Sequence, residues 1–389
     1  MAVKIIRQPN KIALLGAPTS AAAMSLGHEG APTALRVAGL LDRLRSIGYE
    51  VIDHGDDPPQ LYQPDEESPR ARNLPRVLAA VEALKPRVEV AVKSLALPLI
   101  VSGDCSVALA TVAGARRYFR NVSMIYMDRD ADLNTPATTP SGCVDGMVVS
   151  HLTGRGAAEL VRFWGEPPLV REPDLALFGV ARLDPPEEQL LERSPLRRYL
   201  ASDVQRMGAA AAAQAAVERI HANGYEFILH FDVDVIADFP ATNYPGSGGL
   251  TLEEVREALK VFATQKHLAA IEITAYNPTK DPDGSGAKVI LDLLADVLEA
   301  RAKAVKQEAA SAAESTRATA PPSASATPPA SAIPPAEATV DPQASAAIPP
   351  VAEGEAWSSD ALEETGETEI PDASSETPEP ANEPDETPS

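Results

Sequence analysis

Acidic side chains directly follow three apolar segments that have the length and composition of buried strands. The segment LIVSG is followed by Asp104 and Cys105, MIYM by Asp128, Asp130 and Asp132, and ILHF by Asp232 and Asp234. Residues two apart on an extended chain point to the same side. The spacing therefore predicts that the acids within each of the last two groups converge, whereas Arg129 points away from its acidic neighbours.

Carboxylates that converge in a buried site need positive charge nearby, because they repel one another strongly in a low dielectric. Hard divalent ions such as Mn²⁺ or Mg²⁺ prefer oxygen ligands of this kind. A single acid of this kind can instead cap a helix N-terminus, but capping does not explain five acids after two strands. Magnesium-dependent phosphate chemistry is disfavoured because no glycine-rich phosphate loop or lysine cluster accompanies the acids.

Strands and helices alternate along the first 306 residues and would position these acids. Apolar strands are predicted at 12–18, 49–56, 97–104, 122–128, 174–184, 225–235 and 267–278, and amphipathic helices at 31–48, 74–96, 204–224, 251–265 and 286–307. Thr251 with Glu254 forms a capping-box signature, and Pro86 predicts a kink. The alternation indicates an α/β fold: a three-layer αβα sandwich with a mostly parallel sheet. Such sheets place ligands beyond the carboxyl ends of their strands.

An ordered set of motifs extends over nearly all of residues 11–300. In chain order they are GAPTS, GHEGAPTALRVAGL, VSGDCS, MDRDADLNTPATTPSGCVDGM, GVARLDP, FDVDV and YNP. This set resembles the arginase, agmatinase and formimidoylglutamase family of ureohydrolases. The resemblance implies an arginase-like fold, an oligomer, and two Mn²⁺ ions that share a bridging hydroxide. That hydroxide would attack the guanidinium carbon of arginine or a related compound and release urea and an amine.

The resemblance also implies roles for individual residues. Metal-ligand positions are occupied by Cys105, Asp128, Asp130, Asp132, Asp232 and Asp234. Proton transfer is implied for Asp132 and for Asp145, which replaces a histidine of the family. Substrate-binding positions are occupied by Asn134 and Ser141, which would hold the amino-acid end, and by Asp184, which would pair with its ammonium group.

Four positions depart from the family pattern, and all of them belong to the implied active site. Cys105 and Asp130 replace histidine ligands, but a thiolate and a carboxylate can still bind metal. The alternative for Cys105 is a small buried hydrophobic residue. We expect none of the six histidines to be a ligand. The more negative shell weakens the pull of the metals on bound water, so hydroxide would form at higher pH.

The substrate is less narrowly defined than the reaction. Ala275 stands where arginases carry the glutamate that grips the guanidinium group, and Asp145 is the alternative partner for a cationic substrate. We therefore expect arginine or a modified guanidino, ureido or formimino compound. Cys143 is interpreted as pocket lining, because no histidine base lies near it in the sequence. A second hypothesis is a catalytically weak or inactive family member that acts as a metal-stabilised scaffold or regulatory partner.

The composition divides the chain into a domain at 1–306 and a tail at 307–389. The tail holds 17 acidic residues and one basic residue, a net charge of −16 out of the chain's −22. Its richness in Ala, Pro, Ser and Glu predicts disorder. The sequence has no block of basic residues of the kind that binds nucleic acid. The sequence shows no secretory signal or membrane span, and its two cysteines are too few for a disulfide framework, which together predict a cytoplasmic protein.

Overall fold

The computed structural model describes residues 10–319. The described residues belong to one compact unit, and the second unit, Ser323–Ser389, lies outside them. The predicted disordered tail lies outside them from residue 320 onward, but its first part, 307–319, is helical, so the disorder predicted for that part was wrong. No helix within residues 10–319 is long and apolar enough to cross a membrane.

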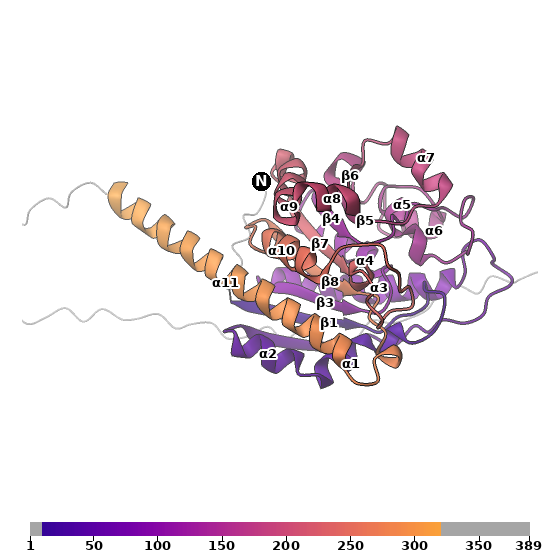
Figure 1. The fold of residues 1–389 in the computed structure, drawn as a ribbon, viewed down its shortest axis with the longest axis horizontal. Helices are drawn as coiled ribbons and strands as arrows, with labels where there is room; N and C mark the ends of the chain where they lie inside the picture. Colours follow the sequence, from indigo (N-terminus) through magenta and orange to yellow (C-terminus); the bar gives the residue numbers. More distant parts are fainter. Residues whose placement is uncertain (1–9, 320–389) are drawn as a thin grey trace, which may run out of the picture. The chain divides into compact units, whose positions relative to one another are not determined.

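Eight strands form one sheet in which every pair of neighbours is parallel (Figure 1). The strands are β1 (Lys11–Ala17), β2 (Glu50–Asp56), β3 (Leu97–Ser102), β4 (Val122–Met127), β5 (Leu175–Val180), β6 (Arg197–Leu200), β7 (Glu226–Asp232) and β8 (Leu268–Thr274). Their order across the sheet is β2-β1-β3-β8-β7-β4-β5-β6. Strands β3, β8, β7 and β4 are thus consecutive neighbours in the middle of the sheet, which brings the ends of the three acid-bearing strands together.

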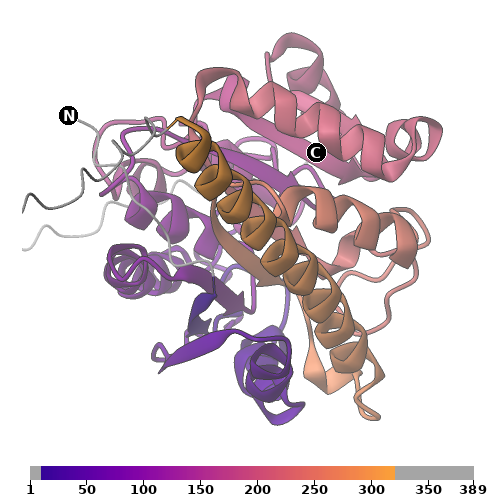
Figure 2. The same ribbon diagram turned by 90° about the vertical axis from the view of Figure 1, so that its left-hand side faces the viewer.

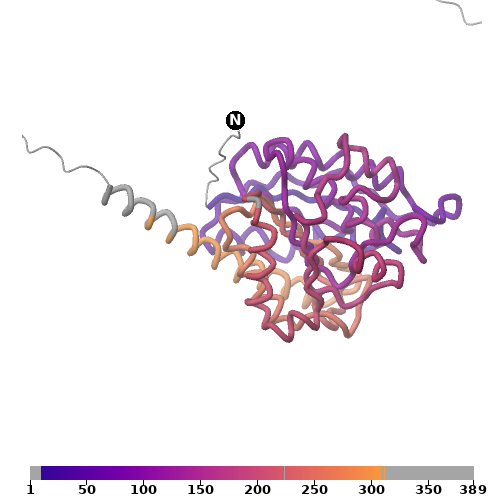
Figure 3. The backbone as a smooth tube through the Cα atoms, turned by 90° about the horizontal axis from the view of Figure 1, so that it is seen from above, coloured from indigo at the N-terminus to yellow at the C-terminus, as the bar shows by residue number. Residues whose placement is uncertain are grey.

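Helices cover both faces of the sheet. They are α1 (Ala31–Val37), α2 (Leu40–Ser46), α3 (Leu74–Lys93), α4 (Val107–Ala115), α5 (Val148–Leu152), α6 (Ala158–Arg162), α7 (Pro185–Arg193), α8 (Ala201–Met207), α9 (Ala209–Ile220), α10 (Leu252–Ala263) and α11 (Ser285–Thr319). Leu14 of β1 belongs to a hydrophobic cluster that also holds residues of α1, α2 and α8 to α11, whereas the adjacent Leu15 belongs to a second cluster with residues of α3 to α7. Figure 3 shows the purple segments of α3 and α4 on one side and the red and orange segments of α9 to α11 on the other. The predicted three-layer αβα sandwich is confirmed, and its sheet is entirely parallel.

Local sequence signals account for where several helices begin and end. The amide of Glu254 donates to the Thr251 hydroxyl, and the amide of Thr251 donates to the Glu254 carboxylate, as the capping-box signature predicts. Gly39 (φ 99°) separates α1 from α2, and Gly208 (φ 87°) separates α8 from α9. Each of these two helix pairs was predicted as one continuous helix, but positive φ angles interrupt a right-handed helix.

The long helix α11 is fixed at its start and along its side. The Asp281 carboxylate accepts hydrogen bonds from the amides of Gly286 and Ala287, which are free backbone donors of the first turn. The buried Arg301 donates to the carbonyl oxygens of Ala263 and Gln265 at the end of α10. Figure 2 shows α11 as the long orange-brown helix lying across the front of the fold. Its contacts with α10 and α2 close one helical layer.

The two edges of the sheet are polar. Strand β2 is largely exposed along its length and carries Glu50, Asp53 and Asp56. Both Asp53 and Asp56 are paired with Arg36. The opposite edge, β6, has only four residues, of which Arg197 and Arg198 are exposed. Strand β6 was not predicted, because its short polar sequence lacks the apolar run by which the other strands were found.

Candidate metal centre

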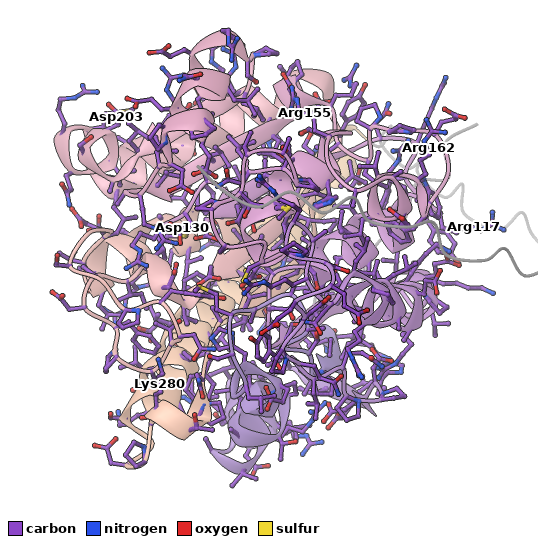
Figure 4. The ribbon with its side chains drawn as sticks, turned by 90° about the vertical axis from the view of Figure 1, so that its right-hand side faces the viewer. Arg117, Asp130, Arg155, Arg162, Asp203 and Lys280 are labelled. Carbon is purple, nitrogen blue, oxygen red and sulfur yellow. The ribbon has the colours of Figure 1, made fainter. Side chains whose placement is uncertain are left out.

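A cavity of about 70 Å³ opens at the carboxyl ends of β3, β4 and β7. Its lining is Met24, Cys105, Asp128, Asp130, Asp132, Ser141, Cys143, Asp145, Gly146, Arg182, Asp232, Asp234 and Tyr244. Asp130, labelled in Figure 4, is the partly exposed acid of this group. All six predicted metal ligands, both predicted proton carriers and Ser141 therefore lie around one cavity, at the edge of the sheet where the sequence placed them.

The turn after β3 presents Cys105 to the acids. The Cys105 thiol lies 2.9 Å from Asp232 Oδ2 and 3.4 Å from Thr274 Oγ1, and its backbone amide donates to Asp145. Burial, followed by the charge of Asp232, raises the pKa of this thiol well above its usual value. The preceding Asp104 points elsewhere and holds the loop that carries Thr19 and Ala22. Cys105 thus touches polar groups as well as the apolar core.

The chain beyond β4 places its acids in three different ways. Asp128 is buried and accepts a hydrogen bond from the amide of Asp130. Both carboxylate oxygens of Asp130 are bound by Arg182. Asp132 has a φ of 51°, so the segment is not extended, and it accepts a 2.5 Å hydrogen bond from the Tyr126 hydroxyl.

Arg129 does not point away from the acids, so the expectation from strand alternation was wrong. Its Nη2 atom lies 3.5 Å from Asp234 Oδ2 and donates to the carbonyl oxygen of Tyr244. Strand β4 ends at Met127, and beyond that point the alternation of an extended chain no longer determines where a side chain points. The site therefore contains a buried cation that the sequence spacing did not predict.

The end of β7 adds a histidine to the acids Asp232 and Asp234. His230 is fully buried, its Nδ1 atom lies 2.8 Å from Glu272 Oε2, and its Nε2 atom lies 3.4 Å from Thr274 Oγ1. The expectation that no histidine is a candidate ligand therefore needs correction. His230 lies two residues before Asp232 on the same strand, so the spacing that grouped the acids would also have found it.

The three predicted substrate-binding residues occupy two places. Ser141 lines the cavity beside Cys143. Asn134 and Asp184 contact each other instead, with Asn134 Nδ2 donating to Asp184 Oδ2 at 2.8 Å. Asp184 also caps the start of α7. The structure thus places these two residues together, next to the loop that leads from Asp132.

Burial dominates the electrostatics of the cavity. Burial is the largest cause of the raised pKa values of Asp128, Asp132 and Asp234, which lie well above the usual range of a carboxyl group. The charges of neighbouring carboxylates raise these pKa values further. Burial and the charge of Asp104 raise the pKa of Asp145 to about 8. Such shifts mean that the ionised carboxylates are unstable without a compensating cation.

Two groups of side chains have donor atoms close enough to hold a cation. Cys105, Asp128, His230 and Asp232 form the first group, and Asp128, Asp130 and Asp234 form the second. Within each group the donor atoms all lie within 4.8 Å of one another. The groups share Asp128. One group offers sulfur, nitrogen and oxygen, and the other offers oxygen alone, so the donors fit divalent metal ions of different kinds.

The fold and this cavity define an α/β protein with a buried candidate metal centre at the carboxyl edge of a parallel sheet. The model of the arginase family matches residues 10–299, and the chain belongs to that family. It is 29% identical over 288 residues to the arginase of Brevibacillus brevis, which covers 74% of this chain and 97% of the relative. It is also 29% identical over 290 residues to the arginase of Bacillus subtilis, with 74% and 97% covered. The crystal structure of the arginase from Bacillus cereus superposes with a TM-score of 0.69 at 27% identity, covering 74% of this chain and 98% of that one.

Proposed function

We propose that this chain is a metal-dependent hydrolase that cleaves a C–N bond in a linear amidine. The substrate class is guanidino, ureido or formimino compounds, arginine among them. The observation that supports this proposal is the gathering of metal-type donors, Ser141 and Asp145 around one cavity in a fold of the arginase family. A bound divalent metal would polarise water and lower its pKa.

The residues of the cavity suit the remaining tasks of such a reaction. Asp132 and Asp145 are proposed as proton carriers, because both line the cavity and each accepts a hydrogen bond from a tyrosine hydroxyl. Burial raises the pKa of the Asp132 carboxyl well above its usual value and that of Asp145 to about 8, so Asp145 is able to hold a proton near neutral pH. Ser141 and Asn134 are proposed to hold the amino-acid end of the substrate, and Asp184, which accepts a hydrogen bond from Asn134, to pair with its ammonium group.

Substrate choice should differ from that of an enzyme that grips guanidinium with a carboxylate at the end of β8. Ala275 occupies that place, is fully buried and carries no charge. A guanidinium group desolvated against it would lose several kcal/mol of interaction energy. The partly exposed Arg182 at the cavity adds positive charge. Both features favour an amidine that is neutral or carries an acidic group over arginine itself.

The test is turnover of a panel of guanidino, ureido and formimino compounds by protein purified without chelators, with urea, ammonia and amine release as readouts. Asp128→Asn should lower turnover by about 100-fold or more, since even residues behind a metal ligand cost 10- to 100-fold. Asp42→Asn, which changes an exposed acid on α2 outside the cavity, serves as the matched control and should leave turnover unchanged. No turnover of any member of the panel by metal-loaded protein would refute the hydrolase.

A second candidate is a family member that binds metal without catalysis and serves as a scaffold or regulatory partner. The observation that favours it is the pairing of Asp130 with Arg182 and of Asp234 with Arg129. These ion pairs occupy acids that a two-metal hydrolase would use. Stoichiometric metal with no turnover in the same experiment would select this candidate.

A further inference from the structure

His230 has the surroundings of a metal-ligating histidine. It is fully buried, and its ring stacks on Tyr126 with 4.2 Å between centroids and 4° between planes. Its Nδ1 atom lies 2.8 Å from Glu272, which is fully buried as well. Donation from Nδ1–H to a Glu272 carboxylate would leave the lone pair of Nε2 for a metal ion. A carboxylate that fixes the tautomer in this way is a regular companion of histidines that bind metal.

The lone pair on Nε2 lacks a short hydrogen-bond partner. The nearest donor is Thr274 Oγ1 at 3.4 Å, but the same hydroxyl lies closer, at 3.2 Å, to Asp232 Oδ2. The Cys105 thiol also points to Asp232 Oδ2, at 2.9 Å. His230 Nε2, Cys105 Sγ and Asp232 Oδ2 therefore lie close together, and only the thiol hydrogen and the Thr274 hydroxyl hydrogen are shared among them. A cation in their midst would satisfy all three.

The second group of candidate ligands, Asp128, Asp130 and Asp234, already has positively charged partners. Arg182 binds both oxygens of Asp130, and Arg129 lies 3.5 Å from Asp234. Arg129 is buried, and a hydrogen bond to the carbonyl oxygen of Tyr244 holds its guanidinium group in place. Two guanidinium groups thus contact acids of this group: Arg182 lines the cavity and binds Asp130, and Arg129 lies beside Asp234. Asp132, the remaining acid among the predicted ligands, accepts a hydrogen bond from the Tyr126 hydroxyl.

We propose that this chain holds a single transition-metal ion of the zinc, cobalt or ferrous type on Cys105, Asp128, His230 and Asp232, and that Arg129 and Arg182 take the place of a second ion. Four donors that include sulfur and nitrogen suit tetrahedral coordination and disfavour Mn²⁺ and Mg²⁺. Glu272 is a positioning residue that orients the His230 ring. This inference deepens the proposed function, since it names the metal of the same cavity, but the metal site does not depend on turnover.

The experiment is a titration of chelator-treated, full-length protein with Co²⁺, followed by absorption spectroscopy. We expect one Co²⁺ per chain, the intense visible bands of tetrahedral cobalt, and a sulfur-to-cobalt charge-transfer band in the near ultraviolet. Cys105→Ser should abolish the charge-transfer band, whereas Cys143→Ser, which changes the other cysteine of the cavity, should keep it. Competition should favour Zn²⁺ over Mn²⁺.

Two further variants test the histidine. His230→Gln should weaken Co²⁺ binding by about 100-fold, and Glu272→Gln by about 10-fold or more through loss of orientation. His151→Gln, at a buried histidine outside the cavity, should bind Co²⁺ as the natural protein does. Far-ultraviolet circular dichroism checks that each variant is folded, and Glu272→Gln alone still tests the site if His230→Gln does not fold.

Two outcomes would overturn the inference: two equivalents of Mn²⁺ bound per chain with no sulfur band from Co²⁺, or unchanged Co²⁺ affinity in folded His230→Gln and Glu272→Gln. Either could occur in an active hydrolase, and so would leave the proposed function standing. The converse result, a single cobalt ion with the sulfur band but no turnover, would support the metal site and count against the hydrolase. The two proposals can therefore fail separately.

Discussion

The buried His151 should make the fold sensitive to mild acid. It lies on α5, shortly after the turn that carries Asp145, and is 1% exposed. Its Nδ1 atom lies 2.7 Å from the carbonyl oxygen of Met147, while Nε2 accepts a hydrogen bond from the amide of Ala157 at 3.1 Å. A second proton would remove that acceptor. Burial accordingly lowers the pKa of His151 from 6.5 to about 4.

The direction of the pH effect follows from that lowered pKa. The unfolded chain takes up a proton below a pKa of about 6.5 and the folded chain only near 4, so acid favours unfolding between these values. The stabilisation is complete above pH 6.5 and is lost as the pH falls towards 4. Between about pH 7 and about pH 4.5 this one histidine should remove roughly 2.5 kcal/mol from the free energy of unfolding.

The comparison that measures this effect is urea unfolding of the natural chain and of His151→Gln, both with chelator, at the two pH values. The variant cannot take up a proton, so its loss of stability between the two values should be smaller by about 2.5 kcal/mol. The titrating acids of the cavity contribute equally to both proteins and cancel in the difference. An identical loss in the two proteins would refute the assignment of a neutral, acid-sensitive His151.

Three further substitutions test the framework around the cavity. Gly103→Ala would place a Cβ 1.8 Å from the carbonyl oxygen of Thr19, so the free energy of unfolding measured in urea should fall by about 3 kcal/mol. Asp281→Ala removes the acceptor for the first turn of α11 and should lower the melting temperature through a loss of about 1–2 kcal/mol. Arg129→Met removes a buried cation beside Asp234 and should destabilise the chelated protein by about 3 kcal/mol in urea. Unchanged stability in any of the three would contradict the contact on which it rests.

The fold was predictable because local pattern and overall architecture agree. Apolar strands alternating with amphipathic helices indicated a parallel sheet covered on both faces, and the general rule for such sheets indicated its carboxyl edge as the site. The breaks at Gly39 and Gly208 were missed because glycine is tolerated within a helical pattern until the tertiary structure requires a positive φ. The short strand β6 was missed because it presents charged side chains to solvent.

The candidate site was predictable only where strand geometry determines it. The positions of Asp128, Asp232 and Cys105 follow from the ends of β4, β7 and β3, which lie together in the middle of the sheet with β8 between β3 and β7. His230 follows from the same strand alternation, because it lies two residues before Asp232, although it does not stand at one of the histidine-ligand positions that the resemblance implies. The pairing of Asp130 with Arg182 could not have been foreseen, because the two residues are brought together by loops whose course no local pattern determines.

The polar edges of the sheet have a consequence for how the protein behaves in concentrated solution. An open parallel sheet presents unpaired backbone groups at both edges, and these can recruit strands of another molecule. On β2, three acids make one edge repel the same edge of a second copy, while Arg197 and Arg198 do so on the short β6. Arg36 offsets one of the two charges of Asp53 and Asp56, which weakens the attraction between unlike edges but leaves the β2 edge negative. The charges that made β6 hard to recognise as a strand therefore guard the sheet against aggregation.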